Sequence, residues 1–223
     1  MISDIIRNGF STDIILKLLA RLFVMFCVLP IHEFAHAFVA NKLGDQTARL
    51  KGRLTLNPLA HLDIFGSLLI IIAGFGYAKP VPVNPRNFKN PKGGMALTAV
   101  AGPVSNLIMG FLFMLCYCAV FRFGAVVQGN FYYNLAYFFM YSCQVNIALA
   151  VFNFHPIPPL DGSRIIQLFI PDRLLFKYAR YERYLVYAVL LVVILGWLDV
   201  PIAYLSSAVS NAFLTAGKAV FGL

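Results

Sequence analysis

Long apolar runs without charge are the feature that most constrains the fold of this chain. Residues 95–121 and 131–153 contain no Asp, Glu, Lys or Arg, and each run is long enough to cross a bilayer as a helix. Only 12% of the 223 residues are charged, about half the share in a soluble domain. A bilayer offers no hydrogen-bond partners to the backbone, so a spanning segment must be a helix or part of a closed barrel. Continuous apolar runs favour helices.

Further apolar segments extend this pattern. Residues 14–40 are long enough to span, and 184–198 is interpreted as a further span. Residues 201–223 are interrupted by serine, asparagine and lysine, so this segment either crosses the membrane or lies in the interface. Residues 64–77 are too few for an upright span, which favours a re-entrant or tilted segment. We therefore expect an all-α polytopic membrane protein with about five to six transmembrane or re-entrant helices.

One integral-membrane domain is expected over residues 1–223, with a functional core at about 14–170 and C-terminal helices at 180–223. The net charge of +9 does not indicate nucleic-acid binding, because the basic residues lie in loops between apolar segments, where they set topology and meet anionic lipid. The four cysteines form no Cys-x-x-Cys pair and lie in apolar runs, which predicts small core residues.

Two segments outside the apolar runs have extended patterns. Polar and apolar residues alternate over 47–56 with the period of a strand. Residues 79–85 contain three prolines, which is typical of an edge strand or a polyproline stretch. Together they predict a small membrane-associated β-hairpin. Such a hairpin either holds a peptide by adding it as a further strand or lies on the lipid surface as an ordinary amphipathic element.

A His-Glu-x-x-His pattern lies within the apolar segment 14–40. His32 and His36 are four residues apart, so both fall on one face of a helix and can share a metal ion. Glu33 is close enough to exchange a proton with a water molecule at that metal. A soluble helix can leave these three side chains in water, but a membrane helix cannot. This setting favours a zinc site over a chance match.

A hydrolytic zinc site usually has a third protein ligand. The polar candidates in or beside the apolar segments are His61, Asp63, His155 and Asp161. Asp161 follows the stiff run 156–160 and precedes a glycine, an irregular backbone that is tolerated at membrane depth only where it is buried in protein or lines a cavity. The alternative is that Asp161 caps a helix over 163–169. The need for a third ligand favours coordination.

Three motifs occur in order: His-Glu-Phe-Ala-His at 32–36, Gly-Pro-Val-Ser-Asn at 102–106, and Asn-Phe-His-Pro-Ile-Pro-Pro-Leu-Asp-Gly at 153–162. Over residues 30–162 the chain resembles the site-2 protease family of intramembrane zinc metalloproteases, and in particular its small bacterial members. The resemblance implies Zn²⁺ as the cofactor, a bacterial plasma-membrane location and the following site residues: His32, His36 and Asp161 as zinc ligands, Glu33 as acid/base, and Asn106 beside the metal for the substrate or the oxyanion.

The chain departs from that family pattern in two places. His155 occupies a position where an aliphatic residue is expected, and it is either a spare ligand or an interfacial histidine, the second being usual for a lone histidine. No PDZ-like insertion is present. His61 is interpreted as a hydrogen-bonded loop histidine, with a gating or supporting role as the alternative.

The expected reaction is hydrolysis of a peptide bond in a membrane protein or peptide substrate. One rival is a metal-ion transporter or metal-binding scaffold, because intramembrane histidines and acids also mark ion paths. That rival predicts polar residues distributed through the spans, whereas most of those in this chain cluster at one depth. A second rival is a relative that binds membrane substrates without cutting them, and the presence of Glu33 argues against it.

Overall fold

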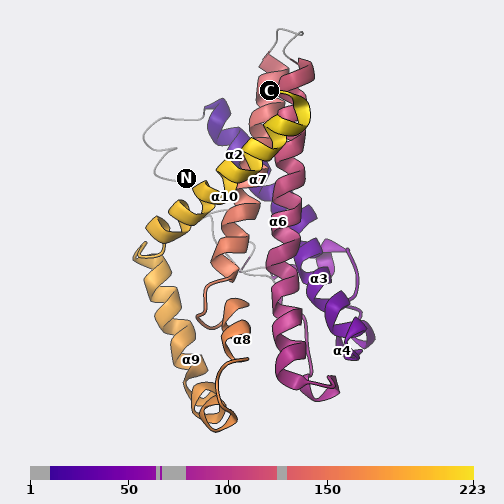
Figure 1. The fold of residues 1–223 in the computed structure, drawn as a ribbon, viewed down its shortest axis with the longest axis vertical. Helices are drawn as coiled ribbons and strands as arrows, with labels where there is room; N and C mark the ends of the chain where they lie inside the picture. Colours follow the sequence, from indigo (N-terminus) through magenta and orange to yellow (C-terminus); the bar gives the residue numbers. More distant parts are fainter. Residues whose placement is uncertain (1–10, 64–65, 67–78, 125–129) are drawn as a thin grey trace.

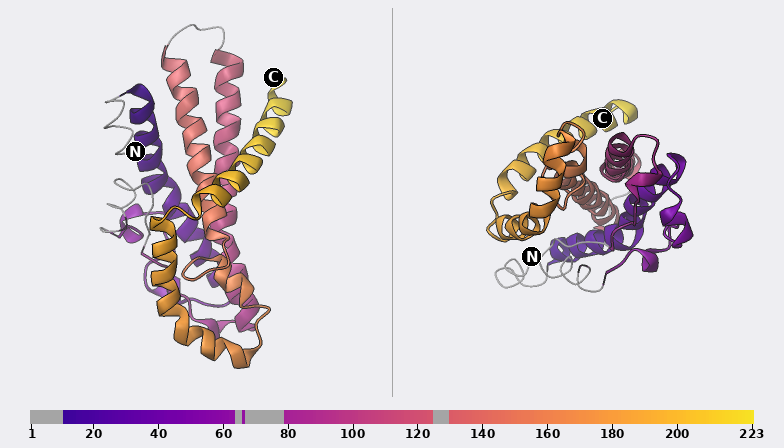
Figure 2. Two further views of the ribbon diagram at one scale, coloured as in Figure 1. Left: turned by 90° about the vertical axis from the view of Figure 1, so that its left-hand side faces the viewer. Right: turned by 90° about the horizontal axis from the view of Figure 1, so that it is seen from below.

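The computed structural model describes residues 11–63, 66, 79–124 and 130–223, and within them the chain is helical. The elements in order are α2 (Thr12–Phe23), η1 (Val24–Val28), α3 (Leu29–Lys42), α4 (Thr47–Leu50), η2 (Pro58–Ala60), η3 (Pro85–Asn87), α6 (Pro91–Gly124), α7 (Asn130–Asn153), α8 (Gly162–Ile166), α9 (Asp172–Ile194) and α10 (Asp199–Phe221). The long helices α6 and α7 run side by side, and α10 crosses them obliquely (Figures 1 and 2).

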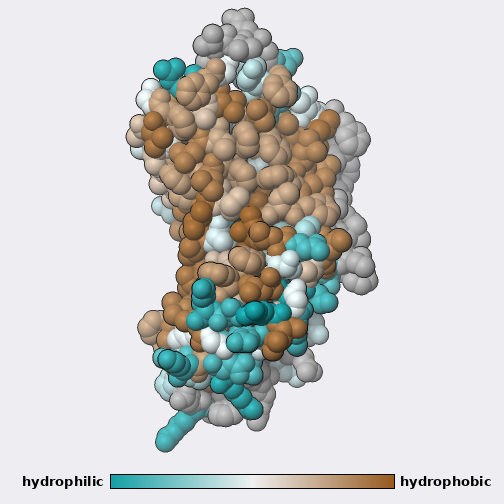
Figure 3. Space-filling model, turned by 90° about the vertical axis from the view of Figure 1, so that its right-hand side faces the viewer, coloured by the Kyte–Doolittle hydropathy of each residue, from teal (hydrophilic) through white to brown (hydrophobic). Residues whose placement is uncertain are grey.

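Three helical segments are long and apolar enough to cross a membrane: Thr12–Lys42, Pro91–Gly124 and Asn130–Asn153. They coincide with the apolar runs at 14–40, 95–121 and 131–153, so these predictions are confirmed. Apolar side chains cover the upper part of the face in Figure 3, and hydrophilic ones gather toward its lower end. The count of five to six spans and the single domain stay predictions. The re-entrant segment predicted at 64–77 lies outside the described residues, apart from Gly66.

The core lies where η1, α6 and α7 meet. Its buried members are Val24, Val28, Phe113, Met114, Cys118, Cys143, Ile147 and Val151. Lipid is as apolar as these side chains, so their close packing against one another, and not the exclusion of water, holds the helices together. Cys118 and Cys143 are core residues as predicted, whereas Cys27 and Cys116 are exposed, and all four thiols are free.

The first span changes its winding just before the two histidines. Residues Val24–Val28 form a π-helical turn, and α3 begins at Leu29 with Pro30 in its first turn. Proline has no amide hydrogen, so the regular hydrogen-bond ladder is interrupted there. A proline inside a long apolar helix is expected to kink or open it, and the structure confirms this expectation at Pro30. After α3, Gly44 has a φ of 111°, the left-handed conformation that commonly follows the end of a helix, and the Asp45 amide returns to the Ala40 carbonyl at 2.9 Å.

The predicted β-hairpin is wrong in the described residues. Thr47–Leu50 forms the short helix α4, followed by a turn at Gly52, whose φ is 67°. The carboxylate of Asp45 accepts hydrogen bonds from the Thr47 amide and hydroxyl, which favours a helical turn over a strand. The exposure of the side chains is also the reverse of what the alternation predicts, because the apolar Leu50 is 81% exposed and the charged Arg53 is buried. Residues 79–84 have no regular secondary structure.

Candidate metal centre

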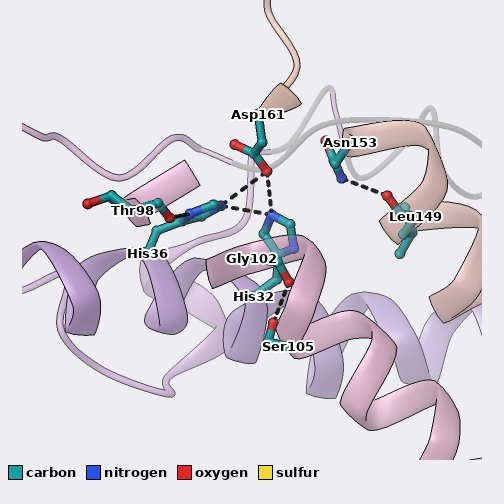
Figure 4. Close-up of polar contacts among 8 residues, drawn as sticks. All are labelled: His32, His36, Thr98, Gly102, Ser105, Leu149, Asn153 and Asp161. Carbon is teal, nitrogen blue, oxygen red and sulfur yellow. Dashed lines mark hydrogen bonds and ion pairs between the residues drawn. The ribbon is translucent and has the colours of Figure 1, made fainter. Parts of the chain in front are cut away.

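His32 and His36 share one face of α3, and their Nε2 atoms are 3.0 Å apart. Both rings are buried. The Nδ1 atom of His36 lies 2.7 Å from the carbonyl oxygen of Thr98 on α6 (Figure 4). A carbonyl can only accept a hydrogen bond, so Nδ1 carries the proton, and in the neutral ring the Nε2 lone pair is left for a metal.

Asp161 comes from a distant part of the chain to the same point. Its Oδ2 atom is 3.4 Å from Nε2 of His32 and 3.3 Å from Nε2 of His36 (Figure 4). Asp161 thus brings a carboxylate oxygen to within ligand spacing of the two imidazole nitrogens. Asp161 precedes α8, yet its side chain makes no capping hydrogen bond there to any described residue. The capping alternative is therefore wrong.

The turn between α7 and α8 requires a glycine after Asp161. A Cβ atom at Gly162 would lie 2.2 Å from the carbonyl oxygen of Phe154 and 2.4 Å from that of His155. Real side chains do not approach backbone atoms this closely. The absence of a side chain at Gly162 thus lets the chain fold back over residues 154–155 and places Asp161 against α3.

The backbone of α6 at Gly102 closes the metal centre on the side of the two histidine rings. A Cβ atom at this position of α6 would lie 2.3 Å from Nε2 of His36 and 2.6 Å from Cε1 of His32. The α6 backbone therefore lies directly against both rings, as Figure 4 shows. The Ser105 hydroxyl donates to the Gly102 carbonyl at 2.6 Å. The role of Gly102 was not predicted from the sequence, although a glycine that begins a motif in an apolar helix can indicate a close approach of another group to the backbone.

The three side chains fit a zinc ion. Tetrahedral zinc with bonds of about 2.0–2.1 Å to nitrogen and oxygen separates its ligand atoms by about 3.3–3.4 Å, and the separations here are 3.0, 3.3 and 3.4 Å. Three lone-pair donors this close repel one another unless a cation or a proton lies among them. Two imidazoles and one carboxylate are ligands that zinc prefers. In the described part of the chain no other cluster of potential metal ligands was found.

Two further predicted site residues lie on helices α3 and α6, which form the metal centre. Glu33 is buried beside His32 on α3. Asn106 is 1% exposed on α6, one helical turn after Gly102, and neither its amide oxygen nor its amide nitrogen has a hydrogen-bond partner among the described residues. A buried amide without partners is costly. It is therefore available to an incoming polar group.

The other polar candidates are engaged elsewhere. His61 is fully buried and donates from Nε2 to the Thr55 carbonyl at 2.7 Å, so its interpretation as a hydrogen-bonded loop histidine is confirmed. His155 is half-buried and donates from Nδ1 to the carbonyl of Val151 in the preceding turn at 2.8 Å. Asp63 accepts from the Gly66 amide. None of the three belongs to the cluster formed by His32, His36 and Asp161.

Comparison with known proteins identifies the family. Residues 124–196 match Peptidase family M50. A Bacillus subtilis protein named "Putative zinc metalloprotease YwhC" is 46% identical over 168 residues, which cover 74% of this chain and 77% of that protein. The chain belongs to peptidase family M50.

More distant relatives agree with this assignment. The Mycolicibacterium smegmatis protein "Putative zinc metalloprotease Rip2" is 27% identical over 72% of this chain and 60% of its own length. The Mycobacterium tuberculosis protein of the same name is 27% identical over 62% of this chain and 52% of its own length. No solved structure matches the chain significantly. The resemblance to site-2 proteases seen in the three motifs is thus confirmed, and a member of M50 is expected to be a peptidase rather than an ion transporter.

Proposed function

We propose that this M50 peptidase is a multi-pass protein of the cell membrane that uses zinc to hydrolyse peptide bonds in or near the transmembrane segments of its substrates. The observation that carries the proposal is the convergence of the ligand atoms of His32, His36 and Asp161 within 3.0–3.4 Å of one another, with both histidines on an apolar helical segment long enough to cross a membrane. Such a donor set beside lipid has a clear use in hydrolysis and no evident structural one.

The residues around the three ligands have separate roles. When bound, zinc would polarise the scissile carbonyl and acidify a water molecule. Glu33 takes the proton from the attacking water and returns it to the leaving nitrogen. Asn106 donates from its free amide to the carbonyl oxygen as negative charge develops there. Thr98 holds His36 in the tautomer that a metal ligand needs.

The substrate must reach this centre in an extended form. A peptide bond inside a transmembrane helix is shielded by its own hydrogen bond, so the helix has to unwind locally before attack. We assign residues 79–84 as the segment along which the unwound strand lies, paired through its backbone. Residues 47–56, which have no strand conformation, are not part of this surface.

Metal removal is the direct test. Purified protein in proteoliposomes should contain about one zinc per chain and cleave a labelled transmembrane peptide. Treatment with 1,10-phenanthroline should stop cleavage, and added Zn²⁺, unlike Mg²⁺, should restore it because Mg²⁺ prefers oxygen ligands. Cleavage that continues in metal-free protein would contradict the proposal. Zinc uptake into the vesicles without cleavage would favour the transporter alternative.

Asp161→Ala should weaken zinc binding by more than the roughly 10–100-fold that loss of a supporting contact costs, because it removes a ligand. The measurement is a zinc titration against a competing chelator. Asp63→Ala is the control, since Asp63 makes a local hydrogen bond to Gly66 and lies outside the cluster. Full zinc affinity in the Asp161→Ala variant would show that two histidines suffice and would remove Asp161 from the ligand set.

A further inference from the structure

Arg53 is buried without an acidic partner. Its side chain lies between α4 and η2 and is 7% exposed. One guanidinium nitrogen donates to the Ala60 carbonyl, and the other donates to the carbonyls of Lys79 at 2.5 Å and Pro80 at 3.0 Å. Among the described residues no carboxylate pairs with it. Burying a cation is costly, and a guanidinium that satisfies three backbone carbonyls in return fixes their relative positions.

Asp45 makes a second buried contact with the same part of the chain. Its carboxylate is fully buried just after α3 and accepts from the Asn84 amide and the Asn87 side chain, both at 2.7 Å, in addition to Thr47. Burial raises the pKa of the Asp45 carboxyl, but hydrogen bonds from Thr47, Asn84 and Asn87 outweigh this and lower it. Asp45 therefore remains an anion with its acceptors occupied.

These contacts hold residues 79–84 at both ends. Arg53 binds the first two carbonyls, the Lys79 amide donates to the His61 carbonyl at 2.8 Å, and Asp45 binds the last amide. Prolines at positions 80 and 82 restrict the backbone between them. Among the described residues, no backbone hydrogen bond joins residues 81–83 to another segment, and Val81 and Val83 have the amide hydrogens that pairing with an added strand requires.

We propose that Arg53 and Asp45 are positioning residues that hold residues 79–84 extended and in register, so that this segment fixes which bond of an unwound membrane peptide lies at the metal centre. The inference rests on the proposed function. Asp45 follows the end of α3, the helix that carries His32 and His36, and therefore ties the Asn84 end of the segment to that helix. The α4 region lies beside the lower part of α3, as Figure 1 shows.

The first experiment measures binding without turnover. In a Glu33→Gln background, a fluorescent transmembrane peptide should bind about tenfold more weakly when Arg53→Gln is added, because the ordering of the segment is lost. Arg49→Gln is the matched control: Arg49 is exposed on α4 and the same charge is removed. Arg53→Lys should recover part of the affinity, since an ammonium keeps the charge but cannot bind three carbonyls in one plane.

The second experiment maps the cleaved bond by mass spectrometry in the active enzyme. Wild type should cut mainly one bond, whereas Arg53→Gln should cut several neighbouring bonds with unchanged zinc content. A role in folding alone would lower zinc content and would not spread the cleavage sites. If Arg53→Gln fails to fold, Asp45→Asn tests the other end, because the carboxylate uses one oxygen for the Asn84 amide and the other for Asn87 and Thr47, whereas asparagine has only one acceptor oxygen. Unchanged affinity and an unchanged cleavage site would overturn the inference, whereas a wild type that cuts nothing would instead contradict the proposed function.

Discussion

Glu33→Gln is expected to stop peptide hydrolysis and leave the zinc in place. Glutamine has nearly the same shape as glutamate but cannot accept the proton of the attacking water, and loss of a general base costs about 10²–10⁴-fold in rate. Glu33 is buried on α3 beside His32 and is not one of the three converging ligand side chains. The measurement is the initial rate of cleavage of a labelled transmembrane peptide, together with the zinc content of the same sample.

The control for this experiment is Glu182→Gln. Glu182 lies on α9 and is the other glutamate of the chain. Its substitution removes the same charge far along the sequence from the metal motifs, so the cleavage rate should stay close to that of wild type. Cleavage retained by the Glu33→Gln variant would exclude Glu33 from the mechanism. Loss of zinc from that variant would mean that the glutamate supports the metal and would leave its proton-transfer role unsupported.

Gly102→Ala should strongly weaken zinc binding. The added methyl group would lie 2.3 Å from Nε2 of His36 and 2.6 Å from Cε1 of His32. Neither side can retreat easily, because the rings are buried on α3 and Gly102 is followed by the buried Pro103 within α6. We expect zinc affinity to fall by at least about 100-fold, the upper range for loss of a supporting contact, and cleavage to fall with it.

Gly110→Ala is the matched control for Gly102→Ala. Gly110 lies two turns further along α6, and a Cβ atom there would be 3.4 Å from the Cβ of Asn146, which is an ordinary contact. Zinc analysis and circular dichroism should show normal metal and helix content for Gly110→Ala. The Gly102→Ala protein should keep its helix content but lose the metal. Normal zinc content in Gly102→Ala would contradict the close approach of α6 to the histidine pair.

The failure of the hairpin prediction shows where periodicity misleads. The alternation over 47–56 suggested one wet face and one apolar face. In the structure the arginine at position 53 is inside, bound to carbonyls, and the leucine at position 50 is outside. A period of two predicts a strand only if another strand is available to pair with, and the local hydrogen bonds from Thr47 to Asp45 are not visible in a hydropathy pattern.

The sequence alone determined the three confirmed spans, the opening before Pro30 and the pairing of His32 with His36, because each depends on the composition or spacing of neighbouring residues in one helix. Only the tertiary structure decided that Asp161 faces that pair, that the Gly102 backbone closes the centre and that Arg53 binds residues 79–80. These contacts join segments far apart in the chain. Their geometry follows from how whole helices pack, which no local pattern contains.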